Sequence, residues 1–400
     1  MKKRICIITF SLTSRDPRVL RQIEYLSPHF DLTVLGFGSH KAKQENVEVY
    51  TLNRGNKRLW KIIEIFLLLL GKVSGIGYDL WLKWRPQYRH AQHIANNAKA
   101  DLYHANDWAS LVIALRAAAI TGAQVVFDAH EYWPLQAENN RFWQLFFSPL
   151  IQYTLRKYVS KVDGFITVSP PIAERYREEF GVDPIIVRNA PKLIPLSPHS
   201  TADPNHIRLI HHGVALRDRG LESLIEALAQ TESRFCFDLM LLPSEPDYLA
   251  ELKHLAQQLT PDRVTFLEPV APGAVLETLA SYNIALCIIQ PTTYNYLMSL
   301  PNKLFESLAA GLAVCVGPSP AMAELTRQYD VGWVCDSFEP AAIAKTLNGI
   351  NVEEIEVCQK SAHEAAKELN ADIEMGKLVD LYQRLLTEDH ASNTSRNPIS

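Results

Sequence analysis

Residues 299–311 (SLPNKLFESLAAG) combine a predicted helix start with one basic and one acidic side chain. Pro301 suits the first turn of a helix, and Gly311 suits its end. Backbone N–H groups without intrahelical partners attract an anion such as pyrophosphate to a helix start, where Lys303 adds positive charge. Glu306, one turn further, could accept hydrogen bonds from paired ribose hydroxyls. The alternative is that Lys303 and Glu306 form an ordinary i,i+3 surface pair.

A second candidate, residues 211–220 (HHGVALRDRG), follows a β-rich run. Loops after the strands of a parallel sheet lie at the edge where ligands bind. Arg217 and Arg219 in this loop each carry a guanidinium that can hold phosphate oxygens through two parallel hydrogen bonds. The alternative is a solvated, charged turn.

A third candidate is the strand end at residues 125–134 (VVFDAHEYWP). A histidine such as His130 at the carboxyl end of a strand can bind a substrate hydroxyl, and a carboxylate nearby can set its tautomer. A lone histidine is more often structural, but Asp128, His130 and Glu131 occur together, which favours a functional interpretation.

The loop at residues 11–18 (SLTSRDPR) follows the first predicted strand. Asp16 can cap the next helix, and Pro17 suits its first turn. The loop, which includes Arg15, is therefore predicted to reach the same edge of the sheet, although nothing in it specifies a substrate.

Several common motifs are absent from the sequence. No GxGxxG follows the first strand, and neither GxxxxGK[ST] nor HExxH occurs, which argues against dehydrogenase, P-loop and zincin chemistry. The six cysteines are scattered without zinc spacing, and most of them are predicted to be buried thiols in a reducing compartment. No DxD pair occurs, so no metal or other cofactor is expected, and Arg219, Lys303 and a helix start would supply the positive charge at a phosphate site.

Strand-like runs alternate with helical periodicity along most of the 400 residues, which predicts parallel sheets covered by helices. Seven strands are predicted in the first half, at residues 5–10, 32–37, 47–52, 102–105, 125–128, 165–168 and 185–187, and six in the second half, at residues 207–211, 237–242, 264–267, 284–289, 313–316 and 332–335. The length favours two domains. A proline-rich stretch near residues 191–204 predicts the linker between them. The predicted organisation is an N-terminal Rossmann-like domain over 1–192, a linker over 193–205, a second Rossmann-like domain over 206–365, a C-terminal helix over 366–388 and a disordered tail over 389–400.

The formal net charge of −4 argues against a dominant nucleic-acid surface. The start of the chain has too short an apolar stretch for a signal peptide, so a cytoplasmic location is expected. Residues 60–85 contain WKIIEIFLLLL followed by Trp81, Trp84 and Arg85. This run is too short to cross a bilayer, and it predicts either a core helix or a helix lying peripherally at the inner membrane face.

Taken in order, these motifs make the sequence resemble glycosyltransferase family 4, the retaining group with the GT-B fold. The likeness runs along nearly all of the chain. It is carried by residues 16–19 (DPRV), 128–131 (DAHE), 167–169 (TVS), Asn189, 219–220 (RG), 301–306 (PNKLFE) and 309–311 (AAG). The PNKLFE segment is the most specific of these.

The resemblance implies an α/β fold of two Rossmann-like, doubly wound parallel-sheet domains facing a cleft. The second domain would bind a nucleotide sugar, with Arg219 at the diphosphate and Glu306 at the ribose, while His130 reaches the donor sugar. The implied catalytic residues are His130, Arg219 and Lys303, the donor-binding residues Gly213, Arg217, Ser299, Asn302 and Glu306, and the acceptor-side residues Arg15, Asp16 and Glu131.

The sequence departs from the family pattern at two positions. Met298 stands where the family often has the first of two glutamates, which normally contacts the sugar. Members with the same PNKLFE wording also lack that glutamate, so its loss does not predict inactivity. Val214 follows Gly213 where a basic residue is common, and Arg217 is the candidate to replace it.

The expected activity is transfer of a sugar, with retention, from a nucleotide-diphosphate sugar to a lipid-linked or polysaccharide acceptor. The positively charged site would stabilise the departing diphosphate. The apolar segment at residues 60–85 alone suggests a membrane-associated acceptor. Two alternatives remain at this stage, namely a sugar-nucleotide epimerase of the same architecture and a catalytically silent sugar-nucleotide-binding protein.

Overall fold

The computed structural model describes residues 2–38, 44–53, 57–196 and 202–387. By their contacts, the residues divide into two compact units. The first unit is Met1–Arg188 together with Met375–Ser400, and the second is Asn189–Glu374. The predicted tail at 389–400 lies outside the described residues, as does part of the predicted linker.

The first unit is built on a seven-stranded parallel sheet in the order β3-β2-β1-β4-β5-β6-β7. All seven predicted strands are confirmed. The chain winds outward from β1 to β3 and then returns to β4 beside β1, so the order reverses between β1 and β4. The strands are β1 (Arg4–Leu12), β2 (Asp31–Phe37), β3 (Val47–Thr51), β4 (Leu102–Asn106), β5 (Gln124–Asp128), β6 (Gly164–Thr167) and β7 (Ile185–Ile186).

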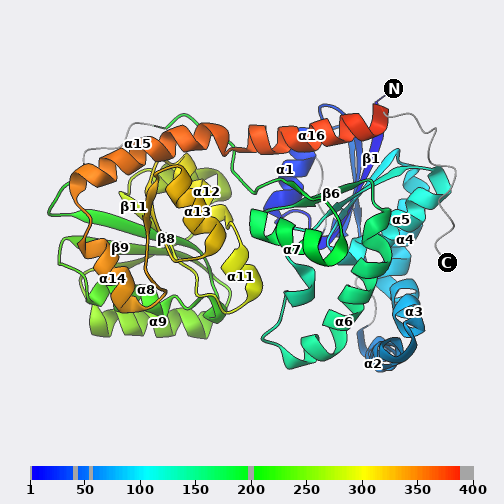
Figure 1. The fold of residues 1–400 in the computed structure, drawn as a ribbon, viewed down its shortest axis with the longest axis horizontal. Helices are drawn as coiled ribbons and strands as arrows, with labels where there is room; N and C mark the ends of the chain where they lie inside the picture. The colour runs from blue at the N-terminus through cyan, green and yellow to red at the C-terminus, as the bar shows by residue number, and fades with distance from the viewer. Residues whose placement is uncertain (1, 39–43, 54–56, 197–201, 388–400) are drawn as a thin grey trace. The chain divides into compact units, whose positions relative to one another are not determined.

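Helices cover this sheet (Figure 1). Helix α1 begins as predicted, because the Asp16 carboxylate accepts hydrogen bonds from the Arg18 and Val19 amides and Pro17 occupies the first turn. The helices are α1 (Pro17–Leu26), α2 (Lys57–Ser74), α3 (Ile76–Trp84), α4 (Pro86–Ala98), α5 (Trp108–Thr121), α6 (Arg141–Tyr158) and α7 (Pro170–Phe180), with short 3₁₀ turns η1 (Trp133–Leu135) and η2 (Val159–Lys161).

The second unit repeats this winding in a six-stranded parallel sheet of order β10-β9-β8-β11-β12-β13. All six predicted strands are confirmed, and the order reverses between β8 and β11. The strands are β8 (Ile207–Ala215), β9 (Phe235–Pro243), β10 (Val264–Leu267), β11 (Ile284–Cys287), β12 (Ala313–Val316) and β13 (Gly332–Val334).

Two apolar clusters, one on each face of this second sheet, form the core of the unit. Ile210 and Leu304 belong to one cluster, and Leu209 and Leu224 belong to the other. The helices of this unit are α8 (Glu222–Ala229), α9 (Pro246–Leu259), α10 (Val275–Leu279), α11 (Tyr294–Met298), α12 (Asn302–Ala309), α13 (Pro320–Gln328), α14 (Pro340–Asn348) and α15 (Val352–Glu368), with 3₁₀ turns η3 (Arg217–Arg219) and η4 (Pro272–Ala274).

The end of the chain differs from the predicted single helix over 366–388. It forms two helices, α15 and α16 (Ala371–Thr387), that break at Asn370. The Asn370 side chain donates to the Ala366 and Lys367 carbonyls and accepts from the Ile373 amide, so it ends one helix and caps the next. Helix α16 then packs into the core of the first unit through Met375, Leu378 and Tyr382, so this unit is made from both ends of the chain.

The apolar segment at residues 60–85 forms parts of α2 and α3. Leu67, Leu68 and Trp81 are buried, which agrees with the core interpretation for one face of this helix pair. The opposite side of α2 is open to solvent, with Ile62 79% and Val73 87% exposed. Among the described residues, no helix is long and apolar enough to span a bilayer.

Candidate functional site

The candidate anion site lies in the second unit, where the order of strands reverses between β8 and β11. Open parallel sheets bind ligands at such a reversal, beyond the carboxyl ends of the strands. The loop after β8 and the loop after β11 are joined there, because the Gln290 amide donates to the Arg219 carbonyl at 3.1 Å and the Thr292 hydroxyl donates to the Asp218 carbonyl at 2.7 Å. These bonds set Arg219 beside the segment that leads to Lys303.

Lys303 is buried, with only 6% of its surface exposed. Its Nζ lies 2.8 Å from Nε2 of His211, and the residue itself belongs to the first turn of α12. Burial, and after it the nearby positive charge of Arg219, lower the pKa of the Lys303 ammonium to about 7 against the opposing effects of Cys287 and Glu306. A buried cation of this kind gains strongly from an incoming anion.

Gly213 at the end of β8 leaves space for both cations. A β-carbon at this position would lie 3.2 Å from the Lys303 Nζ and 3.4 Å from the Arg219 Nη1. Gly213 also has φ +141°, which favours glycine. Arg219 Nη1 donates to the Val214 carbonyl at 3.3 Å, while its buried Nε has no hydrogen-bond partner among the described residues. The two cations and the glycine therefore form one cluster.

Glu306 is held beside this cluster by the histidine that follows His211. Its Oε2 lies 2.8 Å from Nε2 of His212. A carboxylate only accepts hydrogen bonds, so His212 donates from Nε2. About a quarter of the Glu306 side chain remains exposed, which leaves carboxylate capacity for ligand hydroxyls. The i,i+3 surface-pair alternative is not what the structure shows, because Lys303 and Glu306 each contact a different histidine.

Helix α12 starts one residue later than the predicted position. Pro301 is the N-cap residue and Asn302 the first helical residue, so the amides of the first turn face out from the helix start. Ser299 precedes it in extended backbone, and its hydroxyl donates to the Tyr296 carbonyl at 3.3 Å. Met298 is the last residue of the short helix α11.

The structure does not bring Arg217 into this cluster. Its guanidinium makes two 2.6 Å hydrogen bonds to the Glu251 carboxylate and lies over the Tyr248 ring. Helix α9 supplies both partners. Arg217 is thus engaged with α9, and the cations that lie beside Gly213 are those of Lys303 and Arg219.

In the first unit, a buried polar network supports the strand that leads to His130. The Arg18 guanidinium binds both oxygens of the Asp128 carboxylate at 2.7 Å. Burial by itself would raise the pKa of Asp128, but Arg18 and His104 outweigh it and hold that pKa well below its usual range. Gln22 also donates to Asp128, and the Tyr382 hydroxyl of α16 hydrogen-bonds His104.

His130 lies just beyond this network, near the carboxyl groups of Asp107 and Glu131. Its Nε2 lies 3.5 Å from Oδ1 of Asp107, and its ring packs edge-on against Trp133. Burial raises the pKa of both Asp107 and Glu131, and the nearby His130 lowers both. These groups lie at the carboxyl ends of β4 and β5, the edge predicted for chemistry.

Arg15 and Asp16 have different environments. Arg15 is exposed in the loop after β1, whereas the Asp16 carboxylate caps α1. Asp16 is also close enough to raise the pKa of the Asp107 carboxyl through charge repulsion. Of the predicted acceptor-side residues, Asp16 and Glu131 therefore lie near His130, and Asp16 has a structural role as well.

Four side chains that were not predicted as site residues take part in these sites: Arg18, Asp107, His211 and His212. Asp107 has φ 74° and ψ 151°, a conformation that is costly for any residue but glycine. Strain of this kind often marks functional positions, but the sequence does not show it. The two consecutive histidines could have been noticed as unusual polar residues at the end of an apolar strand.

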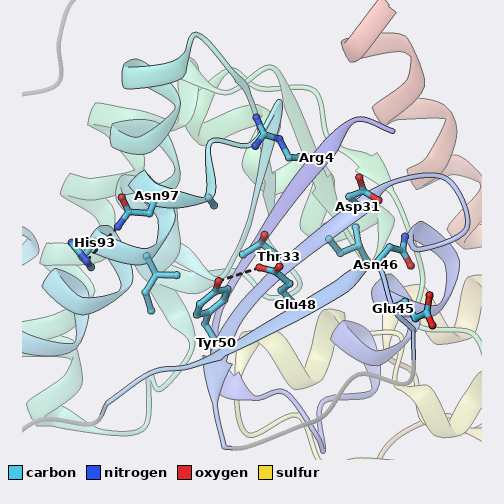
Figure 2. A pocket seen from close by; sticks show the side chains of 12 residues that line it. Arg4, Asp31, Thr33, Glu45, Asn46, Glu48, Tyr50, His93 and Asn97 are labelled. Carbon is cyan, nitrogen blue, oxygen red and sulfur yellow. Dashed lines mark hydrogen bonds between the residues drawn. The ribbon is translucent and has the colours of Figure 1, made fainter. Parts of the chain in front are cut away.

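A separate hollow of about 630 Å³ in the first unit lies away from the sheet edge formed by the carboxyl ends of β4 and β5. It runs between the β2–β3 pair and helix α4, and Figure 2 shows Arg4 and Asp31 at the amino ends of their strands together with the hydrogen-bonded Glu48 and Tyr50. Ligand sites of doubly wound sheets lie at the other edge, so this hollow is not part of the candidate site. Within the described residues, no group of three or more histidine, cysteine or carboxylate side chains is placed to hold a metal ion.

Two family models match the chain in sequence. Glycosyltransferase Family 4 matches residues 24–191, and glycosyl transferases group 1 matches residues 207–350. Between them they cover most of both units. No curated protein matches the chain in sequence.

Solved structures show the same fold at low identity. The Anabaena protein Alr3699/HepE, solved with UDP and glucose, is 17% identical with a TM-score of 0.69 over 96% of this chain and 100% of that one. Sucrose-phosphate synthase from Thermosynechococcus elongatus is 14% identical with a TM-score of 0.73 over 97% and 100%. WaaG, a glycosyltransferase involved in lipopolysaccharide biosynthesis, is 13% identical with a TM-score of 0.66 over 96% and 100%. The two parallel-sheet units thus have the GT-B architecture predicted from the sequence.

Proposed function

Because the chain belongs to the glycosyltransferases of family 4 and group 1, we propose that it transfers a sugar from a nucleotide-diphosphate sugar, with retention, to a lipid-linked or polysaccharide acceptor. One observation carries the donor assignment: Lys303 and Arg219 converge on Gly213 where the strand order reverses. The structural relatives support this, since the Anabaena protein was solved with UDP, UDP-glucose, or UDP and glucose.

The chemistry follows from the positions of these charges. When the sugar–phosphate bond breaks, negative charge accumulates on the departing diphosphate. In this proposal Arg219, Lys303 and the amides at the start of α12 stabilise that charge, and such preorganisation is a large part of enzymatic catalysis. Because the protein itself provides two cations at this point, we expect transfer to proceed without a divalent metal ion.

Retention fits the side chains of the donor cluster. Among the described residues, Glu306 supplies the carboxylate of the donor cluster. The hydrogen bond from His212 holds this carboxylate in a position that suits ribose hydroxyls better than the reacting carbon. Attack by the acceptor on the face from which the diphosphate departs needs no protein nucleophile. In this scheme His130, oriented by Asp107, contacts the transferred sugar.

The proposal is tested by measuring transfer from a panel of nucleotide sugars with Arg219→Ala and Glu306→Ala. We expect kcat for Arg219→Ala to fall by about 10²- to 10³-fold, as for other donors that stabilise transition-state charge. Glu306→Ala should mainly raise the KM for the nucleotide sugar. Matched controls are Arg327→Ala and Glu324→Ala, which are exposed on α13. Wild-type rates for both site variants would refute the assignment.

The same assay without acceptor separates transfer from epimerisation. A transferase releases nucleotide diphosphate only slowly when the sugar has nowhere to go except water. An epimerase would convert the free donor at full rate without any acceptor. Product analysis by NMR identifies the anomeric configuration, and an inverted product would refute retention.

The proposed acceptor class rests on the exposed side of α2. Ile62, Phe66, Leu69 and Val73 recur at helical spacing, and each is at least half exposed. Helix α6, which packs against α2, adds the exposed Phe142 and Leu145. A continuous apolar stripe of this kind is typical of a helix that lies at a membrane surface.

Charges beside the stripe agree with an anionic bilayer. Lys61 and Lys72 are exposed on α2. The acidic residue within the helix, Glu64, is turned inward, where it accepts a hydrogen bond from the Trp81 indole and pairs with Arg85. The stripe therefore presents apolar and basic groups together, the combination that binds anionic lipid headgroups.

Sedimentation with phosphatidylglycerol-containing liposomes tests this part of the proposal. The wild-type chain should pellet, and Phe66→Asp together with Val73→Asp should abolish pelleting. Ile120→Asp is the control, since Ile120 is 65% exposed on α5, outside the stripe. A wild-type chain that stays in the supernatant would refute the membrane contact and leave the donor assignment standing.

A further inference from the structure

We propose that His211 is a positioning residue that aims the Lys303 amine at the donor diphosphate, and that nucleotide-sugar binding is coupled to uptake of one proton at Lys303. This inference rests on the proposed function, because it concerns the same donor site. It adds a residue and a pH dependence that neither the sequence pattern nor the family assignment supplies.

The imidazole of His211 is fixed in one tautomer by its neighbours. The paired register of β8 and β11 ends at Ile210 and Ala285. Beyond that point the Leu286 carbonyl lies 2.7 Å from Nδ1 of His211. A carbonyl only accepts hydrogen bonds, so Nδ1 carries the proton and Nε2 presents its lone pair.

That lone pair is directed at Lys303. The Nε2–Nζ distance is 2.8 Å, and both residues are almost completely buried, at 1% and 6% exposure. Burial, followed by the charge of Lys303, lowers the pKa of His211 well below its usual value, so the ring stays neutral. His211 can therefore hold Lys303 in place without repelling it.

The charged and titratable groups around Lys303 come from each neighbouring element. Arg219 faces it from η3, Cys287 from β11, Glu306 from its own helix and His211 from β8, where His212 follows. Among the described residues that affect the Lys303 pKa, Arg219 carries a full positive charge and disfavours the ammonium, as burial does. With a pKa of about 7, Lys303 is largely uncharged at pH 8 when the site is empty.

A bound diphosphate reverses this balance. Its negative charges favour the ammonium and raise the Lys303 pKa in the complex, so binding above pH 7 takes up a proton. Affinity should therefore be constant below about pH 7 and fall as the pH rises above it, by at most about tenfold per pH unit for one proton. The fall ends where the pH passes the raised pKa of the complex.

Titration calorimetry measures the proton directly. UDP-glucose and GDP-mannose are titrated into the full-length chain at pH 8 in Hepes and in Tris, whose different ionisation enthalpies report proton uptake. We expect net uptake approaching one proton at pH 8 and little at pH 6. Lys303→Arg keeps the positive charge but cannot lose its proton, so it should bind with neither proton uptake nor a pH slope.

Two variants of His211 separate positioning from a merely structural role. His211→Leu removes the acceptor and should lower kcat/KM by about 10- to 100-fold, as expected for loss of a hydrogen bond to a charged group, and alter the pH profile. His211→Gln should recover much of that loss, because its amide oxygen can accept from Lys303. His254→Leu, at an exposed histidine of α9, is the matched control. Thermal melts establish whether each variant is folded. If His211→Leu does not fold, Lys303→Arg and His211→Gln still test the inference.

The outcomes distinguish this inference from the proposed function. If no nucleotide sugar binds the wild-type chain, the proposed function fails, and the inference with it. If a nucleotide sugar binds tightly without proton uptake, or His211→Leu keeps the wild-type pH profile and kcat/KM, the inference alone is overturned. Binding with uptake that Lys303→Arg abolishes supports both.

Discussion

Arg18 and Asp128 form a two-pronged ion pair inside the first unit, with both N–O distances at 2.7 Å, although 110 residues separate them in the sequence. Arg18 belongs to the first turn of α1, and Asp128 ends β5, two residues before His130. A further Arg18 nitrogen donates to the Val187 carbonyl. The pair explains why the DPRV and DAHE segments occur together: DPRV supplies the Arg18 cation, and DAHE supplies the buried Asp128 carboxylate that pairs with it.

Removing one partner of this pair should be costly. Arg18→Met leaves the Asp128 carboxylate buried without its guanidinium, and we expect a loss of about 3–5 kcal/mol in the free energy of unfolding. Urea denaturation at pH 7 measures it. Arg18→Met combined with Asp128→Leu should be less destabilising than Arg18→Met alone, because no unpaired charge then remains. A double variant that loses the sum of both single effects would contradict this account.

The same pair predicts how stability depends on pH. The pKa of Asp128 is lower in the folded than in the unfolded state, so its contribution is fully present above the unfolded value, about 4, and is lost as the pH falls toward the folded value. Wild-type stability should therefore decline below about pH 4 more steeply than that of Asp128→Asn. Equal slopes for the two proteins would show that Asp128 does not contribute.

Gly213→Ala should damage donor binding more than folding. The new methyl group would crowd the Lys303 and Arg219 cations, and the positive φ adds strain. We expect the Kd for a nucleotide sugar to rise about tenfold or more, corresponding to the loss of one interaction with a charged group. Gly273→Ala in η4 is the control, since nothing lies within 4 Å of the added carbon. Unchanged affinity in Gly213→Ala would place the diphosphate elsewhere.

Asp107→Gly should separate stability from activity. Glycine adopts the Asp107 backbone conformation without strain, whereas in other residues this conformation costs about 1–3 kcal/mol. The variant should therefore unfold at a higher temperature. It also removes the carboxylate beside His130, so kcat should fall. The comparison is Lys99→Gly, at an exposed residue that also has positive φ, which should raise stability without changing kcat. An Asp107→Gly enzyme with full activity would show that this carboxylate has no role.

Tyr382→Phe tests whether α16 completes the polar core of the first unit. The substitution removes the hydroxyl that hydrogen-bonds His104 and leaves a buried ring nitrogen unsatisfied. We expect a loss of about 1–3 kcal/mol in unfolding free energy. Tyr50→Phe is the comparison, because its hydroxyl bonds Glu48 at the surface and its removal should change little. A similar small effect for both would mean that the buried contact contributes no more than an exposed one.

The sequence predicted the strands well because each is a short apolar run, and consecutive runs in a doubly wound sheet bury both faces. It predicted the start of α12 because proline, lysine and glutamate spacing is local information. It did not predict His211, since the role of that ring depends on the Leu286 carbonyl of a neighbouring strand. It misplaced the last helix for the same reason: Asn370 breaks the helical pattern, and only the core of the first unit shows where α16 packs.

The placement of α16 has a consequence for synthesis on the ribosome. Residues 2–188 emerge first, yet the apolar side chains of Met375 and Leu378 and the hydroxyl that satisfies His104 are translated only after the whole second sheet. Until α16 is made, the N-terminal half of the nascent chain therefore has an open apolar groove and an incomplete buried polar network. A stalled or truncated chain that ends before residue 371 would expose that groove, which makes it a natural substrate for chaperones and proteases.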